Sequence, residues 1–340
     1  MERELVTVQP SKLSWQVLDI DPEAETARIV ENLRDVTGRV LRRRGLVVAI
    51  SGGVDSSVCA ALAVRALGPE RVLALILPER DSASESSSRG HLLAEHLGVP
   101  CEVHDIAPTL EAIGCYARRD AAVRRVLPGY GDGWRMKIAI RGGTEGQINH
   151  FRLIAAAPDG TEHDRPLGLR EYLEVVAATS FKQRIRKTIE YFHADRLNYA
   201  VVGTPNRLEY DQGFFVKNGD GSADVKPIAH LYKTQVYALA KHLNLPESIR
   251  DASPTTDTYS LPQGQDEFYF ALPYREMDLA LWALNHHVPA ADLAAVLGLS
   301  EQRAEFIYSD IRNKRRTTRY QHRRPVLVEP VAEIETHADV

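Results

Sequence analysis

A glycine pair that directly follows a short, wholly apolar run constrains the fold more than any other feature of the chain. Residues 46–50 are all apolar, as expected of a central parallel strand that is buried on both faces. Gly52 and Gly53 come next, and the apolar stretch at 56–67 is typical of a helix. A strand, a tight turn and a helix in this order predict an α/β sheet rather than a bundle or a sandwich.

The same alternation continues along the chain. Apolar runs at 72–77 and 101–106 predict two more strands, with a helix at 86–97 between them. A helix at 181–193 and a strand at 199–203 resume the pattern. Strands and helices that alternate with short connections predict a doubly wound parallel sheet. The other helices that we expect lie at 21–44, 229–243, 274–286, 290–297 and 300–313.

Composition excludes several classes of protein. The 340 residues are 44% hydrophobic and 26% charged, with a formal net charge of −4, which rules out a disordered chain or a collagen and argues against a general nucleic-acid binder. The apolar runs are far shorter than the ~20 residues of a membrane span, and the first residues do not form a secretory signal. Cys59, Cys101 and Cys115 show neither a disulfide framework nor zinc-ligand spacing. We therefore expect a cytoplasmic protein.

We expect a single domain at 21–330, with an N-terminal arm at 1–20 and a C-terminal tail at 331–340. Length alone suggests about two domains, but α/β folds often exceed 200 residues as one unit. Residues 118–178 interrupt the strand–helix rhythm with many glycines and a Pro-Asp-Gly turn at 158–160. This segment is expected to be a loop-rich insertion with a small hairpin before the turn.

The residues after the first strand have the chemistry of a phosphate-binding loop. The glycines let backbone N–H groups approach phosphate closely, and the start of the following helix adds aligned donors and a positive dipole end. Asp55 is explained by Mg²⁺, which bridges carboxylate and phosphate oxygens. The alternative is a tight turn with a serine helix cap. The loop itself reads Ser51-Gly52-Gly53-Val54-Asp55-Ser56-Ser57.

A second polar cluster follows the strand expected at 199–203. Thr204 comes at the end of that strand, where ligands bind in open α/β sheets. Glu209 is a candidate for a second metal carboxylate. Phe214 and Lys217 combine an aromatic surface with a cation, which suits a flat, anionic substrate. The stretch at 218–221 is also a good generic turn, but a turn does not explain the whole cluster.

Two motifs together resemble a known family. The loop resembles the SGGxDS loop of enzymes that split ATP into AMP and pyrophosphate, such as NAD, GMP, asparagine and argininosuccinate synthetases and tRNA-modifying enzymes. Residues 203–235 are similar to the ammonia-dependent type of NAD synthetase, with the pattern GTxxxxExxxGFFTKxGDGxxDxxPxxxLxKxQ. The resemblance covers most of 29–316 except 118–178. Further matches lie at 254–257, 265–267, Tyr274, Asp278 and 314–315.

The resemblance implies both a fold and an activity. The fold would be a Rossmann-like parallel sheet of the adenine nucleotide α-hydrolase type with C-terminal helices. The activity would be ATP-dependent amidation of deamido-NAD to NAD through an acyl-adenylate, which releases AMP and pyrophosphate. Glutamine-dependent relatives carry a large extra domain, and the loop here begins at Ser51, so we expect ammonia as the nitrogen donor. The implied partners are these small molecules and a second copy in a homodimer, without membrane or nucleic acid.

The resemblance also assigns roles to individual residues. Mg²⁺ would be held by Asp55 and Glu209. We take Asp55, Lys233 and Asp257 as the catalytic residues; a carboxylate near the acyl carbon, Asp224 or Asp257, is our own candidate to orient ammonium. ATP would be bound by Ser51, Gly52, Gly53, Val54, Asp55, Ser56, Thr204, Lys233 and Thr255. The acid substrate would be contacted by Arg184, Phe214, Lys217, Asp224 and Lys314.

Three other interpretations stay open. An amide-forming ligase of the same fold could act on a different acid, because the insertion and Asn313, where the family has histidine, depart from the pattern. An RNA-modifying or sulfur-transfer enzyme would need a reactive cysteine beside ATP, and no cysteine clearly qualifies. A non-catalytic nucleotide-binding protein would not need Asp55, Glu209 and Lys233 together. The basic run at 312–324 could bind RNA or phosphates, or be a solvated helix end.

Overall fold

The computed structural model describes residues 13–141, 150–252, 258–264, 269–270, 272–329 and 331. Most of the expected arm and tail lies outside these residues, as do Thr255, Asp257 and the motif at 265–267. Among the helices described, none is both long enough and apolar enough to cross a membrane.

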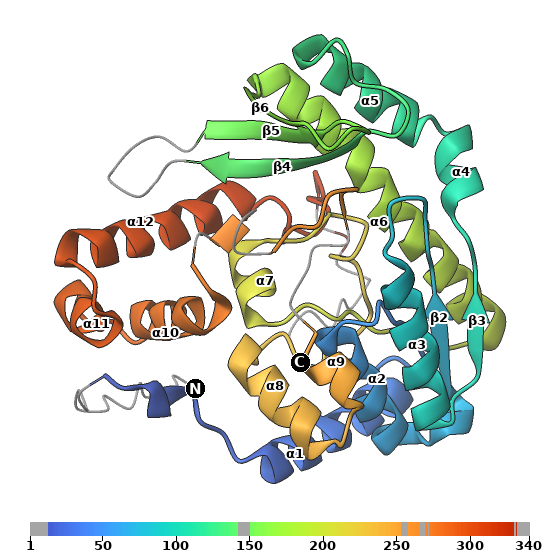
Figure 1. Ribbon diagram of the computed structural model, residues 1–340. Coiled ribbons are helices and arrows are strands. Elements are labelled where there is room, and N and C mark those ends of the chain that lie inside the picture. The colour runs from blue at the N-terminus through green and yellow to red at the C-terminus, as the bar shows by residue number, and fades with distance from the viewer. Residues whose placement is uncertain are drawn as a thin grey trace.

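A four-stranded parallel sheet forms the centre of the molecule (Figure 1), as predicted. Its strands stand in the order β3 (Cys101–Val103), β2 (Val72–Ile76), β1 (Leu46–Ala49) and β7 (Ala200–Val201). The strands expected at 101–106 and 199–203 are shorter than predicted. The carboxylate of Asp105 accepts the N–H of Ala107, where the next helix begins. Beyond β7, pairing is reduced to one isolated bridge between Val202 and Val225.

Helices cover both faces of this sheet, which confirms the doubly wound prediction. Leu46 and Val48 pack with α2 on one face, whereas Val47, between them, packs with α6 on the other. Burial on both faces is why the first strand is uniformly apolar. The helices of the first face are α1 (Pro22–Asp35), α2 (Val54–Leu67), α3 (Ser84–Leu97) and α8 (Lys233–His242), and the second is covered by α6 (Leu169–Leu197).

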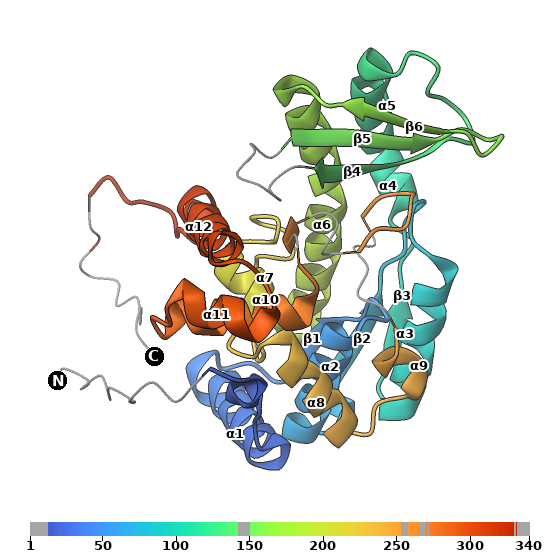
Figure 2. The same ribbon diagram turned by 60° about the vertical axis from the view of Figure 1, so that its left-hand side comes forward.

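The insertion at 118–178 is not loop-rich as expected, although the small hairpin expected at the turn at 158–160 is present. This part of the chain holds the end of α5, a three-stranded antiparallel sheet and the start of α6, which begins at Leu169 rather than at 181 (Figure 2). Met136 and Ile138, like Leu153 and Ala155, alternate with polar or half-buried residues and pack against α5 and α6. That period of two specifies half-buried strands. The elements are α5 (Cys115–Val126), β4 (Arg135–Arg141), β5 (His150–Ala156) and β6 (Glu162–Pro166).

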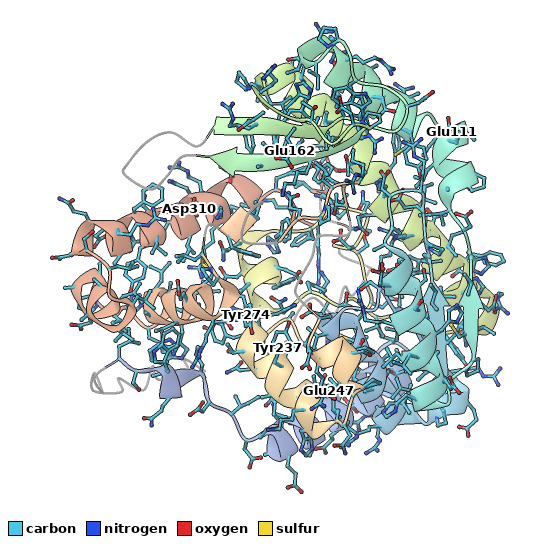
Figure 3. The ribbon with its side chains drawn as sticks, viewed as in Figure 1. Glu111, Glu162, Tyr237, Glu247, Tyr274 and Asp310 are labelled. Atoms are coloured by element: carbon cyan, nitrogen blue, oxygen red, sulfur yellow. The ribbon has the colours of Figure 1, made fainter. Side chains whose placement is uncertain are left out.

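The C-terminal helices form a second core, which also holds the described end of the arm. Leu13 and Leu18 of the arm are buried against them, and the ring of Tyr237 on α8 stacks on that of Tyr274 on α10, with centroids 5.4 Å apart (Figure 3). The helix expected at 21–44 ends early, at Asp35, where a π-helical turn follows. The remaining helices are α4 (Ala107–Ala112), α7 (Arg207–Gln212), α9 (Glu247–Arg250), α10 (Tyr274–Asn285), α11 (Ala290–Leu297) and α12 (Glu301–Thr318).

Packing between α2 and the sheet predicts a large effect of one core substitution. Leu62 of α2 is fully buried, so Leu62→Ala should lower the free energy of unfolding by about 2–5 kcal/mol in urea denaturation. Leu92 of α3 is 41% exposed, and Leu92→Ala should change it by only about 0.5 kcal/mol. Similar losses for the two variants would contradict this account of the core.

Candidate active site

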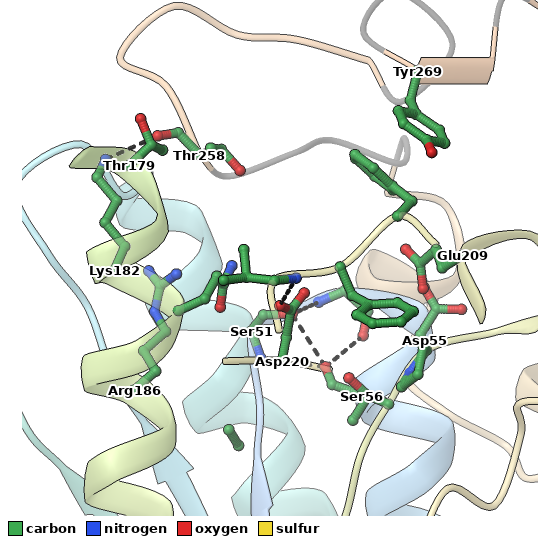
Figure 4. A pocket seen from close by; sticks show the side chains of 18 of the residues that line it. Ser51, Asp55, Ser56, Thr179, Lys182, Arg186, Glu209, Asp220, Thr258 and Tyr269 are labelled. Carbon is green, nitrogen blue, oxygen red and sulfur yellow. Dashed lines mark hydrogen bonds between the residues drawn. The ribbon is translucent and has the colours of Figure 1, made fainter. Parts of the chain in front are cut away.

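A cavity of about 730 Å³ opens where the strands of the parallel sheet end (Figure 4). The loop at 51–56 after β1, the end of β2 at Leu77 and Thr204 after β7 all line it. Carboxyl ends of parallel strands are the usual ligand-binding edge of an α/β sheet. One face of α6, the stretch at 213–216, Lys233 and Tyr237 of α8, and part of α12 line it as well.

Gly52 of the predicted phosphate loop is required by both its backbone conformation and its surroundings. Gly52 has a φ of +75°, and a Cβ placed there would lie 2.5 Å from the carbonyl oxygen of Ser86. Ser56 Oγ accepts the N–H of Ser51 at 3.2 Å and donates to the carbonyl of Gly53 at 3.1 Å. Gly53 is the N-cap of α2, which begins two residues earlier than expected. The N–H groups at the start of α2 therefore face the cavity, where an anion would be stabilised.

A buried ion pair stands at the start of α2. The Nζ of Lys233, 2% exposed, pairs with Asp55 Oδ2, and Asn206 Nδ2 donates to Asp55 Oδ1 at 3.2 Å. Asp278 of α10 fixes the backbone of Lys233, because its Oδ1 accepts the backbone N–H of Lys233 at 3.1 Å. The second oxygen of Asp278 accepts the N–H of Thr234 at 2.7 Å. These contacts fix the predicted ATP residues Asp55 and Lys233 side by side.

Glu209 brings a second carboxylate to the same place, as predicted. It lies beside Asp55 in Figure 4 and belongs to a capping box with Asn206 at the start of α7. Burial, together with the nearby Asp55 carboxylate, raises the pKa of Glu209 to about 8. Two adjacent carboxylates in a partly dehydrated wall are the donor set that a hard divalent cation prefers.

Two of the predicted substrate residues also line the cavity. The ring of Phe214 stacks on that of Tyr269, with centroids 4.6 Å apart. Lys314 donates to Asp310 Oδ2 at 2.6 Å and to the Tyr269 carbonyl at 2.5 Å, and burial lowers the pKa of its ammonium group. Lys314 is thus engaged by protein groups on the α12 side of the cavity.

The other three predicted substrate residues, Arg184, Lys217 and Asp224, do not line the cavity. Arg184 Nε donates to the Lys217 carbonyl at 3.3 Å, and Asp224 Oδ2 accepts the N–H of Val201 at 2.7 Å. The Nζ of Lys217 donates at 3.0 Å to two carbonyls of the segment after α12, those of Tyr320 and Arg323. Thr255 and Asp257 lie outside the described residues.

Several basic side chains in the wall were missed by the sequence analysis. Arg186 Nε donates to the Leu77 carbonyl at 3.2 Å, and Arg89 Nε donates to the Gly52 carbonyl at 3.0 Å. The helical period could have identified the residues on this face of α6. Every fourth residue, namely Lys182, Arg186 and Glu190, lines the cavity. Arg184, two residues from Lys182 and Arg186, points to a different side of the same helix.

Comparisons with known proteins agree with this geometry. A sequence model described as NAD synthase matches residues 25–126 and 158–325. The chain is 56% identical over 323 residues to an NH(3)-dependent NAD(+) synthetase of Rhizobium meliloti (strain 1021), covering 95% of this chain and 96% of the relative. It is 40% identical over 256 residues to one of Thermotoga maritima, covering 73% and 83%.

Solved structures share the fold at lower identity. An NH3-dependent NAD synthetase from Campylobacter jejuni aligns over 91% of this chain and 100% of its own, with a TM-score of 0.59 and 21% identity. An NMN synthetase from Francisella tularensis aligns over 91% and 99%, with a TM-score of 0.61 and 22% identity. The family model and these relatives span most of the chain. The fold and the cavity described above agree with that match. The chain therefore belongs to the NAD synthase family.

Proposed function

We propose that this chain is an ammonia-dependent NAD synthetase, which converts deamido-NAD, ATP and ammonia into NAD, AMP and pyrophosphate. The observation that carries the proposal is the pair of Asp55 and Lys233 beside a glycine loop of the family's type. A carboxylate is a poor electrophile, so its oxygen first attacks the α-phosphorus of ATP and pyrophosphate leaves. Ammonia then attacks the acyl carbon, AMP leaves with the former carboxylate oxygen, and the nitrogen loses its extra proton.

The residues of the cavity have distinct parts in this sequence. The loop at 51–56 binds the phosphates through backbone N–H groups, and Thr204 lies at the same edge. Lys233, dehydrated and fixed by Asp278, stabilises the charge that grows on the leaving pyrophosphate. Holding carboxylate and phosphorus in line contributes up to ~7–11 kcal/mol to such reactions. Asp257 is the proposed group that orients ammonium, and Thr255 the further ATP contact.

Asp55 and Glu209 are the proposed ligands of Mg²⁺. The raised pKa of Glu209 agrees with this role, because burial and then the nearby Asp55 carboxylate keep Glu209 protonated near neutral pH. A divalent cation would let both carboxylates ionise as its ligands. When bound, Mg²⁺ would neutralise phosphate oxygens and so favour departure of pyrophosphate.

Outside the cavity, the proposed contacts with the acid substrate are Arg184, Lys217 and Asp224. Arg184 donates to the Lys217 carbonyl, whereas Asp224 contacts Tyr191 and Val201, and none of the three lines the cavity. A dinucleotide that reaches from the cavity to these residues would need a binding surface beyond the cavity wall. The proposed homodimer would supply such a surface. A cytoplasmic location is part of the same proposal, because all three cysteines are free.

Sulfur transfer receives no support from the site. All three cysteines lie in described parts of the chain, and none of them lines the cavity. Burial also raises the pKa of Cys59 well above its usual range, so that its thiol is unreactive.

A coupled assay tests the proposed reaction. With Mg²⁺, ATP, ammonium and deamido-NAD, the protein should form NAD and AMP in equal amounts, and Lys233→Met should lower kcat about 10²–10³-fold. Lys241→Met, an exposed change on the same helix, should leave kcat unaltered. AMP formed with nicotinic acid mononucleotide but not with deamido-NAD would assign the enzyme to another acid substrate.

The pH dependence of stability tests the charge of Glu209. Its pKa lies at about 8 against an ordinary value of 4.5, so between these values the unfolded chain loses a proton that the folded protein keeps. Wild-type stability should therefore fall as pH rises through this window. Glu209→Gln has no such proton to lose. In the absence of divalent ions, its melting temperature should therefore rise relative to that of the wild type from pH 5 to pH 8.

Added Mg²⁺ should then stabilise the wild type more than the Glu209→Gln variant at pH 8, because only the wild type offers both carboxylates. Parallel stability curves for the two proteins across this pH range would show that Glu209 does not carry the shifted proton.

A further inference from the structure

The middle strand of the insertion sheet brings an aromatic ring to the cavity. Phe151, Leu153 and Ala155 alternate along β5 and therefore lie on one face of it. Leu153 and Ala155 are fully buried in the core shared with α5 and α6, whereas Phe151 is only partly buried and lines the cavity. The backbone of Phe151 is fixed, because β5 is paired on both sides and the Leu167 N–H donates to the Phe151 carbonyl at 2.9 Å.

The ring of Phe151 stacks on that of Tyr172, which lies in the first turns of α6. Their centroids are 3.7 Å apart, with an angle of 17° between the ring planes. Tyr172 lines the cavity as well, and so does Val176 one turn later. A pair that served only to close the core would be buried, yet both rings are only partly buried. The pair therefore offers further aromatic surface to a flat ligand in the cavity.

A second aromatic pair borders the same part of the cavity. Phe214 and Tyr269 stack there, as described above. Burial, and then the nearby Asp310 and Tyr172, raise the pKa of Tyr269, so the two tyrosines belong to one region of the wall. Two stacked pairs from distant parts of the chain make this region aromatic, which suits a flat, uncharged ring rather than a phosphate.

This aromatic region lies far from the phosphate loop. Arg186 of α6 donates to the carbonyl of Leu77 at the sheet edge, and Tyr172 is about 21 Å from Arg186 along the helix, at ~1.5 Å per residue. In the proposed reaction, the acid's carboxylate must meet the α-phosphorus of ATP beside the loop. The pyridine ring carries that carboxylate directly, and the adenine of ATP is one ribose from the α-phosphorus, so both stay near the loop. The second nucleoside of a dinucleotide acid extends farther.

We propose that Phe151, backed by Tyr172, stacks the adenine of deamido-NAD and makes the enzyme prefer this dinucleotide to a mononucleotide acid. The inference rests on the proposed function, which places the reacting carboxylate at ATP. Phe151 lies in the stretch at 127–157 that the family sequence model leaves out, whereas Tyr172 lies in the matched part. The insertion thus supplies a specificity residue of its own. A dinucleotide that ran toward Arg184 instead would leave the cavity and would not need Phe151.

Phe151→Leu tests this stacking, because it keeps an apolar side chain against the core but removes the ring. A base stacked on an aromatic side chain is held strongly enough that the KM for deamido-NAD should rise about tenfold or more. The kcat and the KM for ATP should stay within about twofold of the wild type, because the lost contact is equally present before and during the reaction. Phe151→Tyr keeps the ring and should retain the wild-type KM.

Nicotinic acid mononucleotide, which lacks the adenosine, identifies the part of the substrate that the ring holds. Its kcat/KM, or its inhibition constant against deamido-NAD if it is not turned over, should differ by no more than about twofold between the wild type and Phe151→Leu. The preference for the dinucleotide should therefore shrink about tenfold in the variant. An equal loss with both acids would place the pyridine end on Phe151 and would overturn the proposal.

Trp134→Leu is the matched control. Trp134 packs against the same insertion core, beside Tyr130 and His163, and it too lies in the stretch that the family model leaves out. It is not among the described residues that line the cavity, so both KM values should stay within about twofold of the wild type. If Phe151→Leu does not fold, Phe151→Met also removes the ring and replaces it with the same expected direction.

The outcomes separate the stacking from the proposed function. An unchanged KM for deamido-NAD in Phe151→Leu, or an equal rise in Trp134→Leu, would overturn the stacking. A rise in the KM for ATP alone would also overturn it, because the ring would then hold the adenine of ATP.

A wild type that forms no NAD from deamido-NAD would overturn the proposed function. Calorimetric titration with deamido-NAD would then still test the stacking, which requires a dissociation constant about tenfold higher in Phe151→Leu than in the wild type. A wild type that does not bind deamido-NAD at all would overturn both.

Discussion

The buried pair of Asp55 and Lys233 is the interaction on which the site depends. It joins the first turn of α2, directly after β1, to the first turn of α8 on the same face of the sheet. Removing Lys233 would destabilise this region, because the largely buried Asp55 carboxylate would lose its cation. Asp278 fixes Lys233 from α10, and Asn206 fixes Asp55 from the turn after β7. The ends of β1 and β7 and the helices α2, α8 and α10 thus meet around this charge pair.

This arrangement prepares the site for a highly charged co-substrate. Burial of Glu209, together with the nearby Asp55 carboxylate, raises its pKa to about 8, so a neutral carboxyl lies beside the Asp55–Lys233 pair near pH 7. ATP with a divalent cation would satisfy the carboxylates, the lysine and the exposed N–H groups of the loop together. The chain's near-neutral net charge of −4 conceals this strong local polarity, to which Arg89 beside the loop and Arg186 of α6 add.

Residues next to a strand end could be predicted from the sequence, because a motif fixes their place on the backbone. Asp55, Thr204 and Glu209 lie at the cavity for this reason. Residues whose position depends on a helix face or on distant chain could not be placed in the same way. The resemblance assigns a substrate contact to Arg184, whereas on α6 it is Arg186 that lines the cavity. The contacts of Lys217 with Tyr320 and Arg323 bring together segments about a hundred residues apart, which no local pattern encodes.

In the proposed reaction, the loop directs a carboxylate oxygen of the acid substrate to the α-phosphorus of ATP. This step is tested most directly with deamido-NAD labelled with ¹⁸O in its carboxylate, turned over with ATP and ammonium and followed by mass spectrometry. Adenylation predicts that one labelled oxygen leaves in AMP while the other stays in the amide of NAD. Label in pyrophosphate or inorganic phosphate, with unlabelled AMP, would show attack at another phosphorus and would contradict the account.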